Sequence, residues 1–271
     1  MKYKIFGIDL DGTLLTKFKR ISTKNLKAIK KYVLAGGIPV IITGRSIVSA
    51  YKYHHQIEAY VGQKLPYLSC FNGGLIKNVN TNEDRSIFFN NAIVKSIYND
   101  VINLGGKCWV YTKNITWQNG VYATSLMFVS VFAKLFKNLN VTKLEPNDIK
   151  DVFKLVIYTY LPNVRKIGEY LSTKYKDMNE IVEHGPYCLE VTCKGVNKGY
   201  AISQIAESLN VPLDEVAIIG DSNNDVMAAR VVGMSFAVTK KSKVLNELAT
   251  HKYRKSKHCV ANAINEHLLV E

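Results

Sequence analysis

A pair of acidic residues directly after a short apolar strand constrains this chain more than any other feature. Residues 4–8 read as a buried strand, which delivers Asp9-Leu10-Asp11-Gly12-Thr13 at its end. Successive strand residues point to opposite faces, so Asp9 and Asp11 share one side, and Gly12 lets the chain leave the sheet. Two carboxylates held this close cannot both stay ionised cheaply without a cation or a shared proton between them. Mg²⁺, which prefers oxygen ligands, fits this position best.

Reactive side chains follow two further apolar strands and open one helix. Residues 216–219 lead into Gly220-Asp221-Ser222-Asn223-Asn224-Asp225, residues 38–42 end in Thr43-Gly44-Arg45, and Lys198 opens a helical pattern. Together these segments supply acids, a hydroxyl and a cation, which favours phosphoryl transfer. Each segment alone also has a plain structural interpretation, as a turn, a helix cap or a solvated lysine.

Strands alternate with helices along most of the chain, which is typical of a parallel sheet covered on both faces. One helix is predicted from an N-cap at Ser22 to a stop at Gly36-Gly37, and others over about 46–60, 198–209 and 223–232. Further strands are predicted over 66–71, 188–192 and 235–238, and the last of these is expected to be the final strand. After the polar stretch 78–84 the pattern becomes irregular. We therefore expect a discontinuous core of residues 1–84 and 187–271 with an inserted domain over 85–186. The site should lie at the carboxyl ends of the core strands.

Four separated motifs resemble those of the haloacid dehalogenase superfamily, in the family's order. They are Asp9-x-Asp11-Gly12-Thr13, Thr43-Gly44, Lys198 and Gly220-Asp221-x-x-Asn224-Asp225. Within the superfamily the chain is similar to the Cof-type phosphatases with a C2 (type IIB) cap. The resemblance implies an α/β fold, in which a Rossmann-like parallel-sheet core carries an inserted α/β cap. It covers the two core segments, whereas the middle third matches only in length and position.

The resemblance also implies a role for each motif residue. Asp9 would attack phosphorus to form an aspartyl-phosphate, and Asp11 would act as general acid and then as general base. Mg²⁺ would be held by Asp9, the backbone carbonyl of Asp11 and Asp221, while Asp225 would orient Lys198 or a metal-bound water. The residues expected to hold the phosphoryl group are Leu10, Thr43, Gly44, Lys198 and Asn224.

Composition narrows the partners and the location. The net charge is +14, from 36 basic and 22 acidic residues, which suits an anionic partner, but the lysines are scattered and no nucleic-acid-binding motif accompanies them. No apolar run is long enough to span a membrane and the chain starts without a secretory segment, so we expect a cytoplasmic protein. The five cysteines are an odd number without Cys-x-x-Cys spacing, which argues against a disulfide framework and a zinc site.

The sequence therefore predicts Mg²⁺-dependent hydrolysis of small phosphorylated metabolites, such as sugar phosphates, nucleotides or cofactor phosphates, by a monomer or weak homodimer. A phosphomutase of the same fold is one alternative, and a basic nucleic-acid-binding protein with a vestigial site is another. His54 and His55 point about 100° apart on a helix, so we interpret them as surface residues without a role. Arg45 would support phosphate binding or pair on the surface, and the apolar run 126–136 would pack within the cap.

Overall fold

The computed structural model describes residues 1–112, 116–118, 141–143, 149–160, 162–183, 187–238, 242–254 and 258–270. These residues fall into two compact units. The first unit comprises Met1–Arg45, Ala50–Ser86 and Asn197–Glu271, and the second comprises Ser46–Ser49 and Ile87–Val196. The apolar run predicted over 126–136 lies outside the described residues.

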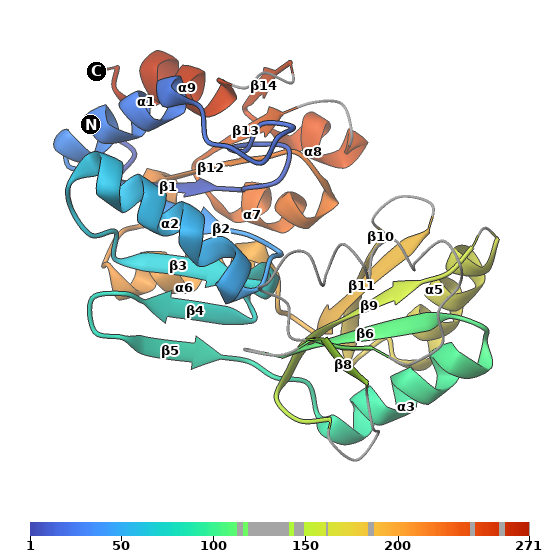
Figure 1. The fold of residues 1–271 in the computed structure, drawn as a ribbon. Helices are drawn as coiled ribbons and strands as arrows, with labels where there is room; N and C mark the ends of the chain where they lie inside the picture. The colour runs from blue at the N-terminus through green and yellow to red at the C-terminus, as the bar shows by residue number, and fades with distance from the viewer. Residues whose placement is uncertain are drawn as a thin grey trace. The chain divides into compact units, whose positions relative to one another are not determined.

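The first unit is built on an eight-stranded sheet in the order β14-β13-β12-β1-β2-β3-β4-β5 (Figure 1). The strands are β1 (Ile5–Ile8), β2 (Ile38–Ile42), β3 (Tyr67–Cys70), β4 (Leu75–Asn78), β5 (Glu83–Ser86), β12 (Val216–Gly220), β13 (Met234–Val238) and β14 (His251–Tyr253). All pairings from β14 to β3 are parallel, and β3, β4 and β5 are joined antiparallel. The carboxyl ends of β1, β2 and β12 therefore lie at one edge of the sheet.

Helices cover both faces of this sheet, because its central strands are apolar at every position. The helices are α1 (Thr23–Leu34), α2 (Ile47–Val61), α6 (Lys198–Ser208), α7 (Val226–Val231), α8 (Lys243–Leu248) and α9 (Cys259–Ala263), with short helices at Phe71–Gly73, Leu213–Glu215, Asn223–Asp225 and Ile264–Leu268. On one face, α6 and α7 share a core cluster with β1, β2 and β12. On the other face, Phe6 of β1 packs edge-on against Tyr32 of α1, with ring centroids 6.1 Å apart.

The ends of α1 follow directly from the sequence. Ser22 is the N-cap, and its side chain accepts a hydrogen bond from the backbone N–H of Asn25 at 3.2 Å. The helix stops before Gly36, whose φ of +90° is readily accessible only to glycine. The predicted cap and stop signal of this helix are confirmed.

Two parts of the core sheet differ from the prediction. Residues 75–86 form a hairpin, β4 and β5, that extends the sheet, where the sequence suggested that the core pauses. The segment His251–Tyr253 adds β14 beside β13, so the strand over 235–238 is not the final one. Both additions lie at the outer edges of the sheet, where strands are short and need little apolar surface.

The second unit contains a six-stranded sheet in the order β10-β11-β9-β6-β7-β8. Its strands are β6 (Lys107–Thr112), β7 (Thr116–Gln118), β8 (Val141–Lys143), β9 (Val152–Tyr158), β10 (Asn179–Glu183) and β11 (Cys188–Cys193), and its helices are α3 (Asn91–Asn103) and α5 (Asn163–Lys174). Alternate residues of β6, β9 and β11 form one core cluster with both helices, which thus cover the same face. The predicted α/β architecture is confirmed.

Within the residues that the structure describes, none of the helices combines the length and the apolar composition needed to cross a membrane. All five cysteines lie among the described residues and none of them forms a disulfide there; three of them are buried.

Candidate active site

The candidate site is assembled where β1 and β12 end side by side. The backbone N–H of Asp9 continues the parallel ladder by donating to the Ile219 carbonyl at 3.0 Å. Asp9 and Asp221 therefore leave the sheet at the same level, and both side chains are buried. Gly12 brings the first loop against Asp221: its φ is +86°, and a Cβ there would lie 2.0 Å from the Asp221 Oδ2 atom.

Lys198 enters the site as the first residue of α6. Asn197 caps this helix by accepting a hydrogen bond from the backbone N–H of Tyr200. The Lys198 ammonium donates to Asp9 Oδ1 at 2.7 Å and to Asp225 Oδ1 at 2.6 Å, and its side chain is only 2% exposed. Burial alone would lower the pKa of Lys198, but the carboxylates of Asp225 and Asp9 together raise it by more than burial lowers it. The side chain is therefore charged.

Asp225 uses both oxygens to organise this site. While Oδ1 accepts from Lys198, Oδ2 accepts from the backbone N–H groups of Asp221 and Ser222 at 3.0 and 3.1 Å. The close approach of the Asp225 side chain to the end of β12 depends on Gly220, because a Cβ at that position would lie 2.1 Å from the Asp225 Cγ atom. Since its acceptors are engaged, Asp225 is better suited to orient Lys198 and the Asp221 loop than to bind an ion.

Asp9, Asp221 and Asp225 form a buried acidic cluster, in which one oxygen from each lies within 4.8 Å of the other two. Burial raises the pKa of Asp9 to about 7; Lys198 opposes this increase, and the neighbouring acids add to it. With all groups ionised, three carboxylates and one ammonium leave a formal charge of −2 in a buried space. A divalent cation would balance that charge, and the all-oxygen donors fit Mg²⁺.

Asp11 is held separately from the acidic cluster by two cations. Arg45 binds it in a bidentate manner, Nε to Oδ2 at 2.5 Å and Nη2 to Oδ1 at 2.6 Å, and the Lys19 ammonium lies 2.5 Å from Oδ1. Burial would raise the pKa of Asp11, but these two partners together lower it to about 2. Asp11 is therefore ionised at neutral pH.

The third strand end brings a polar contact that the sequence did not suggest. Thr43, at the end of β2, is buried and accepts the backbone N–H of Arg45 on Oγ1 at 3.2 Å. Asn72 has the left-handed φ of 55°, donates its backbone N–H to the Thr43 carbonyl and accepts from the Asn224 side chain at 3.1 Å. A Cβ on Gly44 would lie 3.0 Å from the Asn72 oxygen, so this loop is tightly packed.

The predicted residues thus fall into three groups. Asp9, Lys198, Asp221 and Asp225 form one buried network, whereas the Asp11 carboxylate pairs with Arg45 and Lys19. Thr43 and Asn224 are linked through Asn72, and Leu10 is buried beside Asp9. The sequence interpretation missed Lys19 and Asn72; the only signal for Asn72 was its place in an Asn-Gly-Gly turn, because asparagine tolerates left-handed backbone.

Comparison with known proteins identifies the family. A sequence model of the haloacid dehalogenase-like hydrolases matches residues 6–264. The chain therefore belongs to this family.

Relatives and structural neighbours agree with this assignment. The phosphoglycolate phosphatase of Methanobrevibacter smithii is 28% identical over 246 residues, covering 88% of this chain and 86% of the relative. The 5-amino-6-(5-phospho-D-ribitylamino)uracil phosphatase of Bacillus subtilis is 24% identical over 248 residues, covering 92% and 88%. A solved subclass IIB sugar phosphatase of the same superfamily has a TM-score of 0.82 at 17% identity, covering 98% of this chain and 100% of its own. The predicted family, its Cof-type phosphatase class and its fold are confirmed.

Proposed function

We propose that the chain is a Mg²⁺-dependent phosphatase that hydrolyses small phosphorylated metabolites through an aspartyl-phosphate on Asp9. The observation that carries this proposal is the buried contact between Lys198 and Asp9 beside the Asp221 carboxylate. The oxygens of a phosphate monoester are negative and repel an anionic nucleophile, so a site must neutralise them before attack. Lys198 provides one positive charge fixed next to the nucleophile.

Asp9, Asp221 and the backbone carbonyl of Asp11 would hold the Mg²⁺ ion, as the resemblance implies. When bound, the ion would neutralise phosphoryl oxygens and favour the ionised form of the carboxylates around it. Asp225 acts through Lys198 and the Asp221 backbone, to which its two oxygens are hydrogen-bonded. Thr43, the backbone of Leu10 and Gly44, and Asn224 are the proposed contacts of the remaining phosphoryl oxygens.

The reaction has two proton transfers, both assigned to Asp11. Asp9 attacks phosphorus while the ester P–O bond breaks, and the departing alkoxide takes a proton from Asp11. Asp11 then takes a proton from water, whose oxygen displaces Asp9 and releases phosphate. The ionised Asp11 described above is ready for the second transfer, but it needs a proton for the first. We therefore propose that Arg45 and Lys19 release Asp11 when the substrate binds.

The proposed substrates are monoesters of small polar metabolites, including sugar phosphates, nucleotides and cofactor phosphates. Relatives named for phosphoglycolate and for a phosphorylated ribitylaminouracil support this range. The proposed location is the cytoplasm, where five cysteines that form no disulfide would stay reduced. The proposed assembly is a monomer or a weak homodimer.

A phosphate-release assay on a panel of phosphorylated metabolites, with and without Mg²⁺, tests this function. We expect release that requires Mg²⁺ and that falls at least about a thousandfold in Asp9→Asn, because this variant removes the nucleophile. Equal activity of the variant, or no release from any metabolite, would contradict the proposal. Isomerisation of a sugar phosphate without free phosphate would instead identify a phosphomutase. Salt-sensitive RNA binding that survives Asp9→Asn, without hydrolysis by the parent, would identify a nucleic-acid-binding protein.

A further inference from the structure

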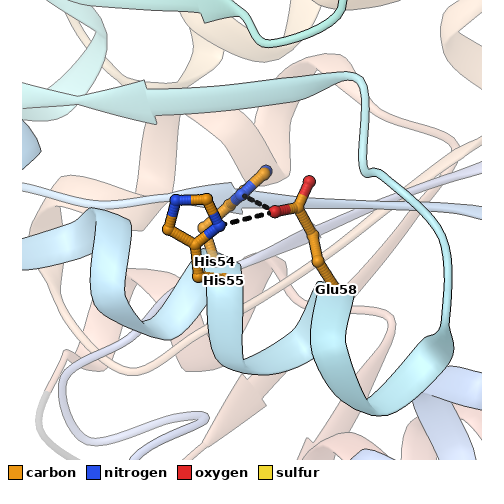
Figure 2. Close-up of side chains that lie close together, drawn as sticks. All are labelled: His54, His55 and Glu58. Carbon is orange, nitrogen blue, oxygen red and sulfur yellow. Dashed lines mark hydrogen bonds and ion pairs between the residues drawn. The ribbon is translucent and has the colours of Figure 1, made fainter.

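Helix α2 carries a second group of metal-ligating side chains, His54, His55 and Glu58, on residues separate from the acidic cluster (Figure 2). One ligand atom from each lies within 4.8 Å of the other two. The interpretation of both histidines as surface residues is wrong for His54, which is fully buried, whereas 58% of the His55 side chain is exposed. Adjacent helical positions diverge, but both rings turn toward the same carboxylate.

Glu58 is oriented by the backbone that follows the helix. Its Oε1 atom accepts the N–H of Leu65 at 3.0 Å, while Oε2 lies 2.8 Å from His55 Nδ1 and 3.5 Å from His54 Nδ1. Around a tetrahedral Zn²⁺ with bonds of about 2.0–2.1 Å, ligand atoms lie about 3.3 Å apart. The spacing from His54 to Glu58 is already close to that value, and the spacing from His55 to Glu58 would have to grow by about 0.5 Å.

His54 is the member of the group that lacks a hydrogen-bond partner in the described part of the chain, since its contact with Glu58 is a 3.5 Å ion pair. Among the described residues, neither of its ring nitrogens has a hydrogen-bond partner, although the ring is completely buried. Complete burial disfavours the charged form of this ring, and a neutral imidazole has a lone pair to donate to a metal ion. Leaving a buried polar group unsatisfied is unfavourable, and a metal ion on Nδ1 would relieve this cost for that nitrogen.

Tyr51 fixes the orientation of both rings from the preceding turn of the helix. Its ring stacks on His54 at a centroid distance of 5.9 Å and meets His55 edge-on at 4.4 Å. Side chains that are held in place before an ion arrives lose less conformational entropy on binding. The exposed position of His55 gives an ion a path from solvent to the buried His54.

We propose that His54, His55 and Glu58 bind one Zn²⁺ or a similar divalent transition metal, with a water in the fourth position. Two imidazoles and one carboxylate suit such ions, whereas Mg²⁺ and Ca²⁺ prefer oxygen ligands throughout. The hydrogen bond from Leu65 to Glu58 orients this ligand from outside the coordination sphere, as second-layer contacts do in metal sites.

Titration of the full-length protein with Co²⁺, a coloured probe, followed by displacement with Zn²⁺, tests this site. Excess Mg²⁺ is added to compete for the acidic cluster, and Asp221→Asn provides a background in which that cluster is weakened. We expect one equivalent of Co²⁺ with the visible absorption of a tetrahedral site, in both backgrounds. Diffraction data at the zinc absorption edge should place the ion within bonding distance of His54, His55 and Glu58.

His55→Ala should weaken binding by more than the roughly 10- to 100-fold that the loss of an outer contact costs, because it removes a direct ligand. His267→Ala is the matched control: this histidine stacks on His251 at 3.8 Å, and its removal should leave binding unchanged. Glu58→Gln gives a second test should His55→Ala fold poorly. Unchanged affinity in His55→Ala and Glu58→Gln, equal loss in His267→Ala, or metal bound only by the three aspartates would overturn the proposal.

Discussion

Replacing Lys198 by methionine tests the electrostatic balance of the candidate active site. The ammonium lies 2.7 Å from Asp9 Oδ1 and 2.6 Å from Asp225 Oδ1, and all three side chains are buried. With an effective dielectric constant of about 20, each contact contributes roughly 6 kcal/mol before the cost of burying the charges. Removing one partner of a buried pair typically costs about 3–5 kcal/mol, because the remaining charge is left uncompensated. We expect Lys198→Met to lower the free energy of unfolding by that amount at pH 8 in metal-free buffer.

The loss of stability in Lys198→Met should depend on pH in a defined direction. Burial already raises the pKa of Asp9 to about 7, above its ordinary value of 3.8, and the loss of Lys198 would raise it further. A carboxyl whose folded pKa is raised favours folding when protonated, so its stabilisation is present at low pH and is lost as pH rises through the folded pKa. One additional proton held by the folded variant gives a slope of about 1.4 kcal/mol per pH unit. Since the parent also holds this proton below about pH 7, the defect should shrink by only about 1.4 kcal/mol from pH 8 to pH 5, most of it above pH 7.

Urea unfolding followed by circular dichroism, from pH 5 to pH 8 with chelator present, measures both effects. Lys243→Met is the control, since this lysine is 90% exposed and its change should be within about 0.5 kcal/mol. Adding Asp225→Asn to Lys198→Met should recover part of the stability at pH 8. A defect of the same size at pH 5 and pH 8 would refute the reasoning, because Asp9 would then not take up a proton when Lys198 is lost.

Three further variants probe other parts of the structure. Gly12→Ala should lower phosphate release and reduce the free energy of unfolding in urea by about 1–3 kcal/mol. The new Cβ would clash with Asp221 of the acidic cluster, and the positive φ at this position is unfavourable for alanine. Unchanged stability and activity would contradict the close packing. Arg45→Gln should raise the pKa of Asp11 from about 2 toward 3.8, as followed by carboxyl carbon NMR, and its effect on stability should stay below about 1 kcal/mol because Asp11 is 41% exposed. Lys154→Met should lower the stability of the second unit by about 3–5 kcal/mol, because it leaves Glu190 as an unpaired buried charge. Adding Glu190→Leu should recover most of this stability, since both members of the buried 2.8 Å pair are then removed. Equal stability of the single and double variants would argue against this explanation.

The central part of the fold could be predicted because its strands are apolar at every position. β1, β2 and β12 are buried on both faces, so they appear in the sequence as short apolar runs, and their last residues locate the reactive groups. The hairpin strand Glu83–Ser86 has no buried position and consists mostly of charged residues, so it resembles a loop. His251–Tyr253 lies at the start of a basic run and pairs on one side only, so it gives no apolar pattern either.

Side-chain contacts between distant segments explain what else the sequence could not provide. Arg45 is 34 positions from Asp11, and nothing local determines whether it binds a phosphate or this carboxylate. The burial of His54 likewise depends on the segments packed against α2, although its neighbour His55 on the same helix is exposed. Sequence patterns specify which chemical groups are available near a site, whereas tertiary packing decides which of them become partners.

The pairing of β1 between β2 and β12 has a consequence for how the protein is made. Ile5 lies opposite Ile38 on one side and Val216 on the other, so the central strand stays half open until most of the chain has left the ribosome. Non-local pairing of this kind slows folding and leaves an apolar strand edge that can associate with other chains. Nascent chains that end before Val216 should therefore depend on chaperones, and truncation of the last strands should cause aggregation rather than simple loss of activity.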